Sequence, residues 1–463
     1  MRAGLEHLAV FGLELGIYWF DPDTNVVDWQ FPDLQSKLMH REGFRFDDNL
    51  MQTNYVFHSF AGATHYVVSR ANGFGVAGSF ASAVASSAFY ELVLEWKEIV
   101  SFNDLIVTPF GGSAMGEFFY HLGNYLGSEP VPASRSFVGY AAQGGARGIV
   151  GGPRLLHDAI DDPASPPWIQ PDNLGLSTAY AHRFRVMFAR DTFRGSSSRL
   201  DGLLAADGEF ELAAMPGFLR PGRFGLWYTN GNFTSFNARL GYENGSREVE
   251  LDFDAHFVGW YAQDLRALSD GVSGHAHEAS FGTGMHYVDR ILFGERDQYG
   301  IIHLARAGQK LWLRSEPLRF ELAVDASPDF ASVKSQAYDE YAARFGREGT
   351  KSSLLRHGYF HGWGLSAGAS AKLGVGPVEV GARARHGRYE AIDGAERVQE
   401  EVTSEPDGSE TITEVGASVG FEPKDAPIVT ELEYARTSRN SALSWLSASR
   451  TWRRFTAAVG VRF

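Results

Sequence analysis

Cysteine is absent from this chain of 463 residues, so disulfide bonds, thiolate metal sites and cysteine nucleophiles are excluded. Positive charge is also scarce, because 42 Lys and Arg residues face 56 Asp and Glu residues and leave a net charge of −14. A nucleic-acid partner, which would need a basic patch, is therefore not expected. No window offers about 20 clean apolar residues for a membrane helix. The nearest, 74–90, is rich in Ala, Ser and Gly and runs into Glu91.

The last nine residues of the chain follow a strict period of two. One face carries Phe455, Ala457, Val459, Val461 and Phe463, and the other carries Thr456, Ala458, Gly460 and Arg462. This period predicts a strand with one apolar face and one small or polar face. An amphipathic strand that ends on a terminal aromatic residue is typical of the strand that closes a bacterial outer-membrane barrel and meets lipid on one side.

The same alternation recurs upstream. It is seen in 248–261, 318–325, 363–373, 378–385 and 414–421. In the first of these runs, every second residue from Val249 to Tyr261 belongs to the apolar face. The opposite face carries Glu248, Glu250, Asp252, Asp254 and His256. Four acids on one side of a strand cannot point into a dry core. They can line a wet lumen while the apolar face meets lipid.

The alternative is a soluble β-sandwich or a lipocalin-like barrel, with the apolar face inside and the charges outside. Alternation alone does not separate the two, but several runs reach 10 or more residues, which favours tilted strands that cross a membrane. We predict about 12 strands, an even number, in residues 176–463. Asn244-Gly245 predicts a two-residue hairpin turn. Polar loops are expected at 391–410 and 326–350.

The first 130 residues follow a helical period instead. Helices are predicted at 5–20, 54–70, 77–100 and 113–126, with Thr108-Pro109 and Gly111-Gly112 breaking the chain between the last two. These helices are too apolar to stand alone and too polar to span lipid. We expect residues 1–130 to form a plug inside the barrel or at its periplasmic mouth. Residues 131–175 are expected to be connecting loops with one short helix at Pro153–Ile160.

Ionisable residues lie at helical spacing in this plug. His58 and His65 are seven residues apart, and Glu117 and His121 are four apart, so each pair shares a helix face. Ser101 and Asp104 resemble a capping box in which Asp replaces Glu. The candidate site residues are His58, His65, Glu91, Glu95, Ser101, Asp104, Glu117 and His121.

Three interpretations of these residues stay open. A metal site needs His and carboxylate ligands from facing helices. Its candidates are His58, His65, Glu117 and His121. Hydrolysis needs a nucleophile beside a base, for which Ser59, Ser101 or Ser113 near a His would serve. The third interpretation is a network of hydrogen bonds and salt bridges that fixes the plug. No cofactor is expected.

Residues 46–126 resemble an uncharacterised domain family of Gram-negative outer-membrane proteins. The pattern has an aspartate pair, an Asn and a His before a small-residue helix, then Tyr-Glu, Ser-x-x-Asp, Thr-Pro, Gly-Gly and Gly-Glu. The matching residues are Asp47, Asp48, Asn54, His58, Gly62, Tyr66, Arg70, Gly73, Tyr90, Glu91, Glu95, Ser101, Asp104, Thr108, Pro109, Gly111, Gly112, Gly116 and Glu117. Ser59, Tyr90 and Val100 depart from the commoner residues of the pattern. The resemblance implies an outer-membrane location and brings no established activity.

We therefore expect a mainly β protein with some α-helix, namely a transmembrane antiparallel β-barrel with an N-terminal helical plug. The expected partners are outer-membrane lipid and the barrel assembly machinery. The location that the resemblance implies suggests that this machinery recognises Phe463. The helices are expected to carry a polar His/Glu site for a lipid, glycolipid or small ligand. The alternatives are a passive structural or transport barrel with a gated pore, and an envelope-lipid hydrolase. Because Met1–His7 lack a secretion signal, we expect an exported chain to be processed.

Overall fold

The structure is a computed structural model that describes residues 2–20, 39, 44–47, 49–95, 100–127, 180–195, 200–269, 271–345, 353–392, 407–424 and 426–463. The chain divides into two units. The first, here called the helical unit, comprises Met1–Ala181 and Leu212–Pro216; the second, the barrel unit, comprises His182–Glu211 and Gly217–Phe463. The predicted loops at 131–175 and their short helix lie outside the described residues. The predicted plug arrangement stays a prediction.

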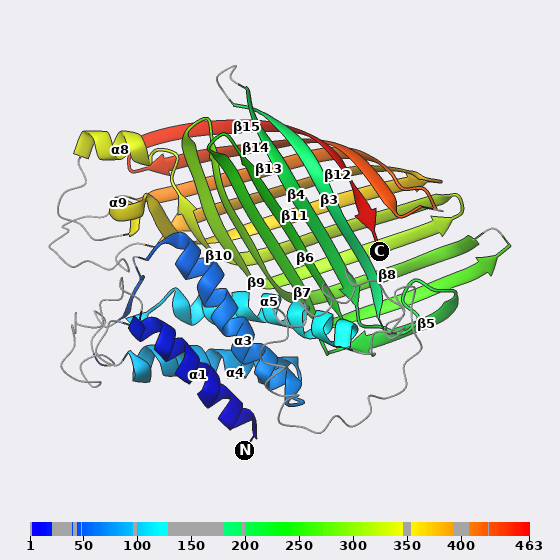
Figure 1. Cartoon of the computed structure of the whole chain (residues 1–463), viewed down its shortest axis with the longest axis horizontal. Helices are drawn as coiled ribbons and strands as arrows, with labels where there is room; N and C mark the ends of the chain where they lie inside the picture. The colour runs from blue at the N-terminus through cyan, green and yellow to red at the C-terminus, as the bar shows by residue number, and fades with distance from the viewer. Residues whose placement is uncertain are drawn as a thin grey trace. The chain divides into compact units, whose positions relative to one another are not determined.

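The barrel unit is built from antiparallel strands (Figure 1). They are β3 (Ala181–Arg194), β4 (Leu200–Ala213), β5 (Gly222–Tyr228), β6 (Phe233–Glu243), β7 (Ser246–Leu268), β8 (Gly271–Leu292), β9 (Glu295–Ser315), β10 (Leu318–Lys334), β11 (Tyr359–Val375), β12 (Val378–Ala391), β13 (Gly408–Phe421), β14 (Ile428–Leu443) and β15 (Leu446–Arg462). Short helices α8 (Tyr338–Phe345) and α9 (Ser353–His357) lie between β10 and β11.

The strands close into a ring. Its order is β7-β6-β4-β3-β15-β14-β13-β12-β11-β10-β9-β8, and β8 pairs back with β7. β5 and β6 pair with successive parts of one edge of β7, so they share a single place in the ring. The terminal strand β15 pairs with β3 and thereby joins the two ends of the barrel. The predicted antiparallel barrel of 12 strands with an N-terminal helical region is confirmed.

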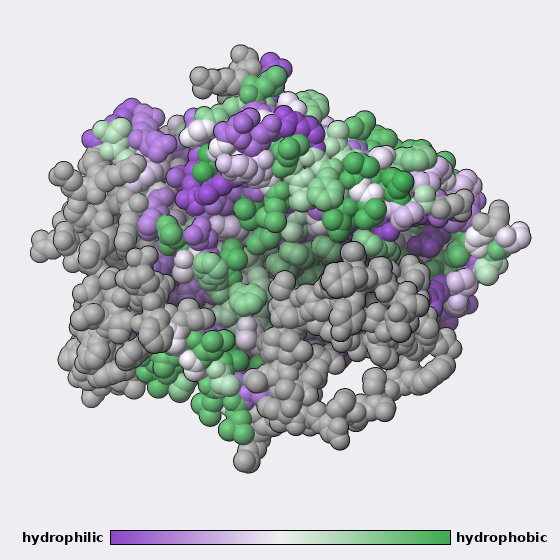
Figure 2. Space-filling model, viewed as in Figure 1, coloured by the Kyte–Doolittle hydropathy of each residue, from purple (hydrophilic) through white to green (hydrophobic). Residues whose placement is uncertain are grey.

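Apolar side chains face outward from this ring and charged ones face inward. Phe455 and Val459 are each 53% exposed, whereas Glu410 and Arg439 inside the ring are 0% exposed. Figure 2 shows hydrophobic residues gathered over the visible barrel wall and hydrophilic residues at the end that carries α8. A soluble barrel would have the opposite distribution, because its apolar face would fill the interior. The inverted distribution is that of a barrel surrounded by lipid.

The alternation predicted for 248–261 reverses after His256. A register shift between His256 and Val258 inserts one extra residue into β7. Tyr261, predicted on the outward face, is instead buried, and its hydroxyl donates to Gln263. A β-bulge places all later residues of a strand on the opposite faces, because side chains alternate with a period of two.

Two predictions about connections have different outcomes. Asn244-Gly245 forms the predicted hairpin turn between β6 and β7, with positive φ angles of 49° and 89°. The loop predicted at 326–350 is wrong, because β10 continues to Lys334 and α8 follows it. A register shift between Ala326 and Asp329 lets the strand pass Pro328 and continue pairing with β9 and β11.

The helical unit contains helices and one pair of very short strands (Figure 1). They are α1 (Arg2–Phe20), β1 (Phe44–Arg45), the π-helix η2 (Thr53–Phe57), α3 (His58–Ala71), α4 (Val76–Phe89), the π-helix η3 (Tyr90–Leu94), β2 (Val100–Ser101) and α5 (Asp104–Gly127). The predicted helix 77–100 therefore ends at Leu94, and Val100 belongs to a strand. Tyr55, Tyr66 and Phe118 are buried at the centre of the unit.

The predicted break at Thr108-Pro109 and Gly111-Gly112 is wrong, because α5 runs through all four residues. Two glycines instead permit close packing of α3 on α5. A Cβ atom on Gly62 would lie 1.8 Å from the Thr108 carbonyl oxygen, and one on Gly112 would lie 2.5 Å from the Gly62 carbonyl carbon. α5 contains Pro109 although a proline inside a helix lacks one backbone hydrogen-bond donor and costs about 3 kcal/mol.

The segment Val76–Leu94 is long and apolar enough to cross a membrane by length and composition, and 33% of its most apolar window is buried. This differs from the expectation of no such window, because the apolar residues Leu92, Val93 and Leu94 continue past Glu91 and one carboxylate lowers the mean hydropathy little. A single helix of this kind also suits the core of a soluble domain, so it assigns no span.

Candidate functional site

The structure distributes seven of the eight candidate residues over separate polar clusters of the helical unit. The first cluster is centred on Glu117 of α5, which is fully buried. Arg70 of α3 donates hydrogen bonds from Nε and Nη2 to its two carboxylate oxygens, each at 2.9 Å. His121 Nε2 lies 3.0 Å from Glu117 Oε1, and its Nδ1 lies 3.2 Å from the Tyr180 hydroxyl. The Arg70 guanidinium also lies over the Tyr120 ring, 4.3 Å from its centroid.

The electrostatics of this first cluster favour a structural role. Burial would raise the pKa of Glu117, but the hydrogen bond from His121 and the charges of His121 and Arg70 hold that pKa below its ordinary value. Burial and the Glu117 carboxylate raise the pKa of Tyr66 well above its ordinary value. Glu117 therefore stays ionised and fully engaged near neutral pH. A carboxylate in this state fixes α3 against α5 and has no proton to transfer.

The second cluster is a chain of hydrogen bonds through His65. His65 Nε2 lies 3.1 Å from Glu14 Oε2 of α1, and His65 Nδ1 lies 2.9 Å from His7 Nδ1. His7 Nε2 in turn lies 3.0 Å from Ser69 Oγ of α3 and 3.1 Å from Ser82 Oγ of α4. A carboxylate is thus connected through two imidazole rings to two hydroxyl groups from different helices.

The chemistry of these groups fixes the direction of the chain when both imidazoles are neutral. An ionised Glu14 only accepts, so His65 donates from Nε2 and accepts at Nδ1 from His7 Nδ1–H. His7 then turns the lone pair of Nε2 toward the hydroxyls. Burial and the neighbouring His65 lower the pKa of His7 to about 4, which keeps it neutral at pH 7. A neutral imidazole beside a hydroxyl is the pairing that activates a serine nucleophile.

The third cluster lies where β1, α3 and α5 meet. His58 Nε2 is 3.5 Å from Asp104 Oδ1. Asp47 completes the group, because one ligand atom from each of these three side chains lies within 4.8 Å of the other two. Asp104 is buried, whereas Asp47 and His58 are half-buried. An imidazole and two carboxylates together form a donor set suited to a divalent metal ion.

Two more candidates, Ser101 and Glu91, adjoin this third cluster. Ser101 Oγ accepts from the Asp104 amide at 3.4 Å, and α5 begins at Asp104, so the predicted helix start is confirmed. Glu91 Oε2 accepts from the Ser101 amide at 2.7 Å. The Glu91 carboxylate therefore supports the strand–helix junction. Glu95 ends η3, and its amide donates to the Tyr90 carbonyl at 3.0 Å, outside the cluster.

Sequence reasoning did not select His7, Glu14, Ser69 and Ser82 as site residues. The spacing held one usable signal, since His7 and Glu14 are seven residues apart and share a face of α1, as His58 and His65 do on α3. Arg70 and Asp47 were part of the resembling pattern but were assigned no role. The spacing of residues along one helix does not show which other helix packs against that face.

The lumen of the barrel holds a further set of charges. Arg439 of β14 pairs with Asp297 of β9 and with Glu410 of β13, the latter at 2.9 Å. In the ring, β9 and β14 are separated by β10, β11, β12 and β13, so the Arg439–Asp297 pair crosses the lumen. Arg385 of β12 reaches Asp252 of β7 at 3.6 Å in the same way. Ion pairs between opposite walls occupy the space that a channel would need.

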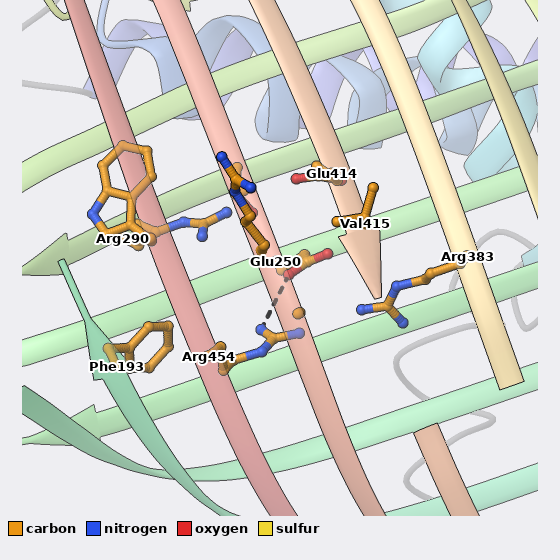
Figure 3. Close-up of a pocket in the computed structure, with 11 residues that line it drawn as sticks. Phe193, Glu250, Arg290, Arg383, Glu414, Val415 and Arg454 are labelled. Carbon is orange, nitrogen blue, oxygen red and sulfur yellow. Dashed lines mark ion pairs between the residues drawn. The ribbon is translucent and has the colours of Figure 1, made fainter. Parts of the chain in front are cut away.

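A small cavity of about 30 Å³ lies among other charged side chains of the barrel, including Glu250, Arg290 and Glu414. Figure 3 shows Glu250 and Arg290 on one wall and Arg454, Glu414 and Arg383 on the other, with acids and bases pointing toward one another. Arg454 lies 4.0 Å from Glu250. One water molecule needs about 10–15 Å³ of such volume, so the cavity accommodates about two waters.

Comparison with known proteins identifies one domain. Residues 43–144 match a domain of unknown function, DUF3943, and the chain thus contains this domain within its helical unit. All three ligand atoms of the third cluster come from the matched segment. No curated protein matches the sequence.

Solved outer-membrane barrels match part of this chain at low identity. The translocator domain of the autotransporter NalP from Neisseria meningitidis is 14% identical, with a TM-score of 0.22, over 70% of this chain and 98% of that one. The outer-membrane protein OmpT of Vibrio cholerae is 8% identical, with a TM-score of 0.21, over 61% and 99%. The outer-membrane protein Omp33 of Acinetobacter baumannii is 9% identical, with a TM-score of 0.21, over 61% and 99%.

Proposed function

We propose that this protein is an integral outer-membrane barrel that anchors a functional helical domain and is itself closed to solutes. The observation that carries this proposal is the set of ion pairs across the lumen, of which Arg439–Asp297 and Arg385–Asp252 are examples. The exposed apolar faces of the strands support the membrane location. A passive pore needs a continuous water-filled lumen, and the described strands place buried charged side chains there.

Channel recording tests the closed barrel. We expect the full chain, extracted from the outer-membrane fraction and reconstituted into planar bilayers, to give no steady ion conductance. The double variant R439A/R385A removes two cations that bridge the lumen, and we expect it to conduct where the wild type does not. The variant R388A is the matched control, because Arg388 pairs with Glu390 on an exposed surface. Steady conductance by the wild-type protein would contradict the proposal, as would its absence from the outer membrane.

The helical domain is then the part that carries the function, and its second cluster is the proposed polar His/Glu site for a lipid, glycolipid or small ligand. Ser82 and His7 are half-buried, so a ligand can reach their polar atoms. Exposed apolar side chains on the same helices, Leu8 of α1 and Val84 of α4, suit the acyl part of an amphiphile.

A second candidate function is ester hydrolysis, favoured by the directed chain from Glu14 to the serine hydroxyls. Ser82 is the better nucleophile, because Ser69 is only 1% exposed. In this reaction Ser82 Oγ attacks the ester carbonyl carbon and its proton passes to His7 Nε2. His7 then protonates the leaving alcohol, and water releases the acid from the acyl-serine.

Labelling with a fluorophosphonate tests hydrolysis directly. We expect one adduct, on Ser82, in the purified full-length protein, and its loss in S82A and H7Q. The control is S79A, which removes a buried hydroxyl one turn earlier on α4. If S79A labels normally and S82A does not, Ser82 is the nucleophile. If the wild-type protein remains unlabelled while still binding an amphiphile, the site binds and does not hydrolyse.

A further inference from the structure

Three side chains from different structural elements converge in the DUF3943 segment. Asp47 follows β1, His58 begins α3, and Asp104 begins α5. Each offers one ligand atom, and these atoms lie within 4.8 Å of one another. The His58 Nε2 to Asp104 Oδ1 distance is 3.5 Å. A divalent ion bonded to N and O atoms at about 2.1 Å holds neighbouring ligand atoms roughly 3–3.5 Å apart. The distance between His58 Nε2 and Asp104 Oδ1 is therefore already that of two ligands of one metal ion.

The local backbone explains why these residues meet. β1 and β2 form a parallel pair in which Phe44 faces Val100 and Arg45 faces Ser101. The Phe102 amide donates to the Arg45 carbonyl at 2.8 Å and extends this pairing. The pairing brings the residues after each strand side by side, so Asp47 comes next to the start of α5.

The third side chain is positioned by an irregular helix. The π-helix η2 immediately precedes His58 and joins α3 without a break. A π-turn contains one residue more than an α-turn and so rotates the following side chains, and such turns recur at functional sites. The second π-helix, η3, carries Glu91, whose carboxylate holds the Ser101 amide. Both π-helices of the described helical unit thus support this one location.

The carboxylates are held by neighbouring amides. Asn103 Nδ2 donates to Asp104 Oδ1 at 2.8 Å, and Asn103 Oδ1 accepts from the Asp47 amide at 2.7 Å. Asn49 Nδ2 hydrogen-bonds to Asp47 Oδ2. Partners of this kind orient the ligands of a metal site and tune its affinity.

We propose that Asp47, His58 and Asp104 bind one divalent first-row transition metal ion, of which Zn²⁺ is the probe. The mixture of imidazole and carboxylate selects such ions over Ca²⁺, which prefers six to eight oxygen ligands. The half-buried positions of Asp47 and His58 leave a route for the ion to enter. The site lies apart from the His7–His65 chain and does not depend on the proposed function of the barrel or of that chain.

Metal binding to the full-length protein in detergent tests the proposal. We expect one Zn²⁺ per chain by elemental analysis after dialysis and by calorimetric titration. Each of the variants H58A and D104N removes one ligand. We expect each to weaken Zn²⁺ binding at least about 10-fold, because the loss of a residue that only orients a ligand already weakens metal binding by about 10–100-fold. X-ray absorption should show nitrogen and oxygen neighbours with no sulfur, since the chain has no Cys.

The matched control is H65A, which removes a buried imidazole seven residues further along α3 and outside the triad. Its Zn²⁺ affinity should equal that of the wild type. A circular dichroism spectrum of each variant establishes that the helices are formed, so lost binding is not lost folding. The proposal is overturned if the wild-type protein binds no stoichiometric Zn²⁺, if it binds Ca²⁺ in preference, or if H65A and H58A weaken binding equally.

Discussion

The helical unit and the barrel unit distribute charge in opposite ways. In the helical unit aromatic and aliphatic side chains such as Tyr55 and Phe118 form the core, and ionisable groups gather in a few clusters. In the barrel unit Arg439 and Glu410 are buried, while Leu432 and Phe455 lie on the outside. In both units buried ionisable groups are paired, as Glu117 is with Arg70 and Glu410 is with Arg439. An apolar core suits a unit in water, whereas apolar side chains outside and charged ones inside suit a barrel in lipid.

The two units also differ in how they achieve close packing. The helices approach through glycines, since α3 and α5 touch where Gly62 meets Thr108. The strands are spaced by backbone hydrogen bonds, and ion pairs fill the space between opposite walls. They too have glycines at close approaches, such as Gly282, where a Cβ atom would lie 1.9 Å from the Ala255 carbonyl oxygen. A change in charge inside the ring should therefore damage the barrel unit most, and an added methyl group at the α3–α5 crossing should damage the helical unit.

The largest effect is expected from charge removal inside the barrel. Arg439→Ala leaves Asp297 and Glu410 buried without their shared cation, which should destabilise the barrel by about 3–5 kcal/mol. Urea unfolding of the detergent-solubilised protein measures it. Arg388→Ala, at the exposed pair with Glu390, is the control and should change stability by about 1 kcal/mol or less. Equal effects of the two variants would mean that the lumen is as wet as the surface.

The next largest loss of stability is expected when arginine replaces a leucine on the outside of the barrel unit. A leucine of nearly equal exposure in the helical unit provides the comparison. Leu432 of β14 is 64% exposed and Leu8 of α1 is 63% exposed. Leu432→Arg places a charge on the lipid-facing side and should cost about 2–4 kcal/mol at the bilayer midplane. Leu8→Arg should cost about 0.5 kcal/mol or less if α1 faces water. Folding into lipid vesicles, followed by urea titration, separates the two. A large loss in both variants would place the Leu8 face of α1 in an apolar environment too.

A smaller effect is expected from a single methyl group at the helix crossing. Gly62→Ala brings a Cβ atom to 1.8 Å from the Thr108 carbonyl oxygen, so α3 and α5 must separate. Overpacking of this kind costs about 1–3 kcal/mol. The control is Gly123→Ala on α5, where nothing lies within 4 Å and where alanine should stabilise the helix by up to about 1 kcal/mol. Thermal melting followed at the helical circular dichroism band measures both, and a neutral Gly62→Ala would remove close packing as the reason for this glycine.

The smallest effect is a pH dependence confined to the helical unit. Burial and His65 depress the pKa of His7 from 6.5 to about 4, so the unfolded chain binds more protons than the folded one between these values. The stabilisation is complete above about pH 6.5 and is lost as the pH falls toward 4. Limited proteolysis of the helical unit across this range should show progressive opening in the wild type. His7→Gln cannot titrate and should lack that part of the dependence; an unchanged pH profile would argue against a buried neutral His7.

Much of the barrel was predictable from local pattern. The period of two identified β13 and β15 and the outward positions of Val419 and Val459, because a strand between water and lipid repeats its contrast at every second residue. The prediction was wrong where one inserted residue reversed the faces of β7, and where β10 continued past Pro328. A bulge leaves the composition of a strand unchanged, and its position is set by the neighbouring strands.

The candidate site was predictable only in part. His58, His65, Glu117 and His121 were selected as ionisable residues on apolar helices, but the structure divides them among three clusters with different chemistry. Their decisive partners, such as Asp47, Arg70 and His7, lie far away in sequence. Spacing along one helix shows which residues share a face, and it carries no information about the helix that covers that face.

By itself the sequence determined the class of the protein, a chain without Cys whose N-terminal part has a helical period and whose C-terminal part has a strand period. It did so because periodicity is a local property of the backbone. Only the tertiary structure decided which charges pair across the lumen and that Asp47, His58 and Asp104 meet. These depend on ring closure and helix crossing, which bring together residues whose separation in sequence exceeds any local repeat.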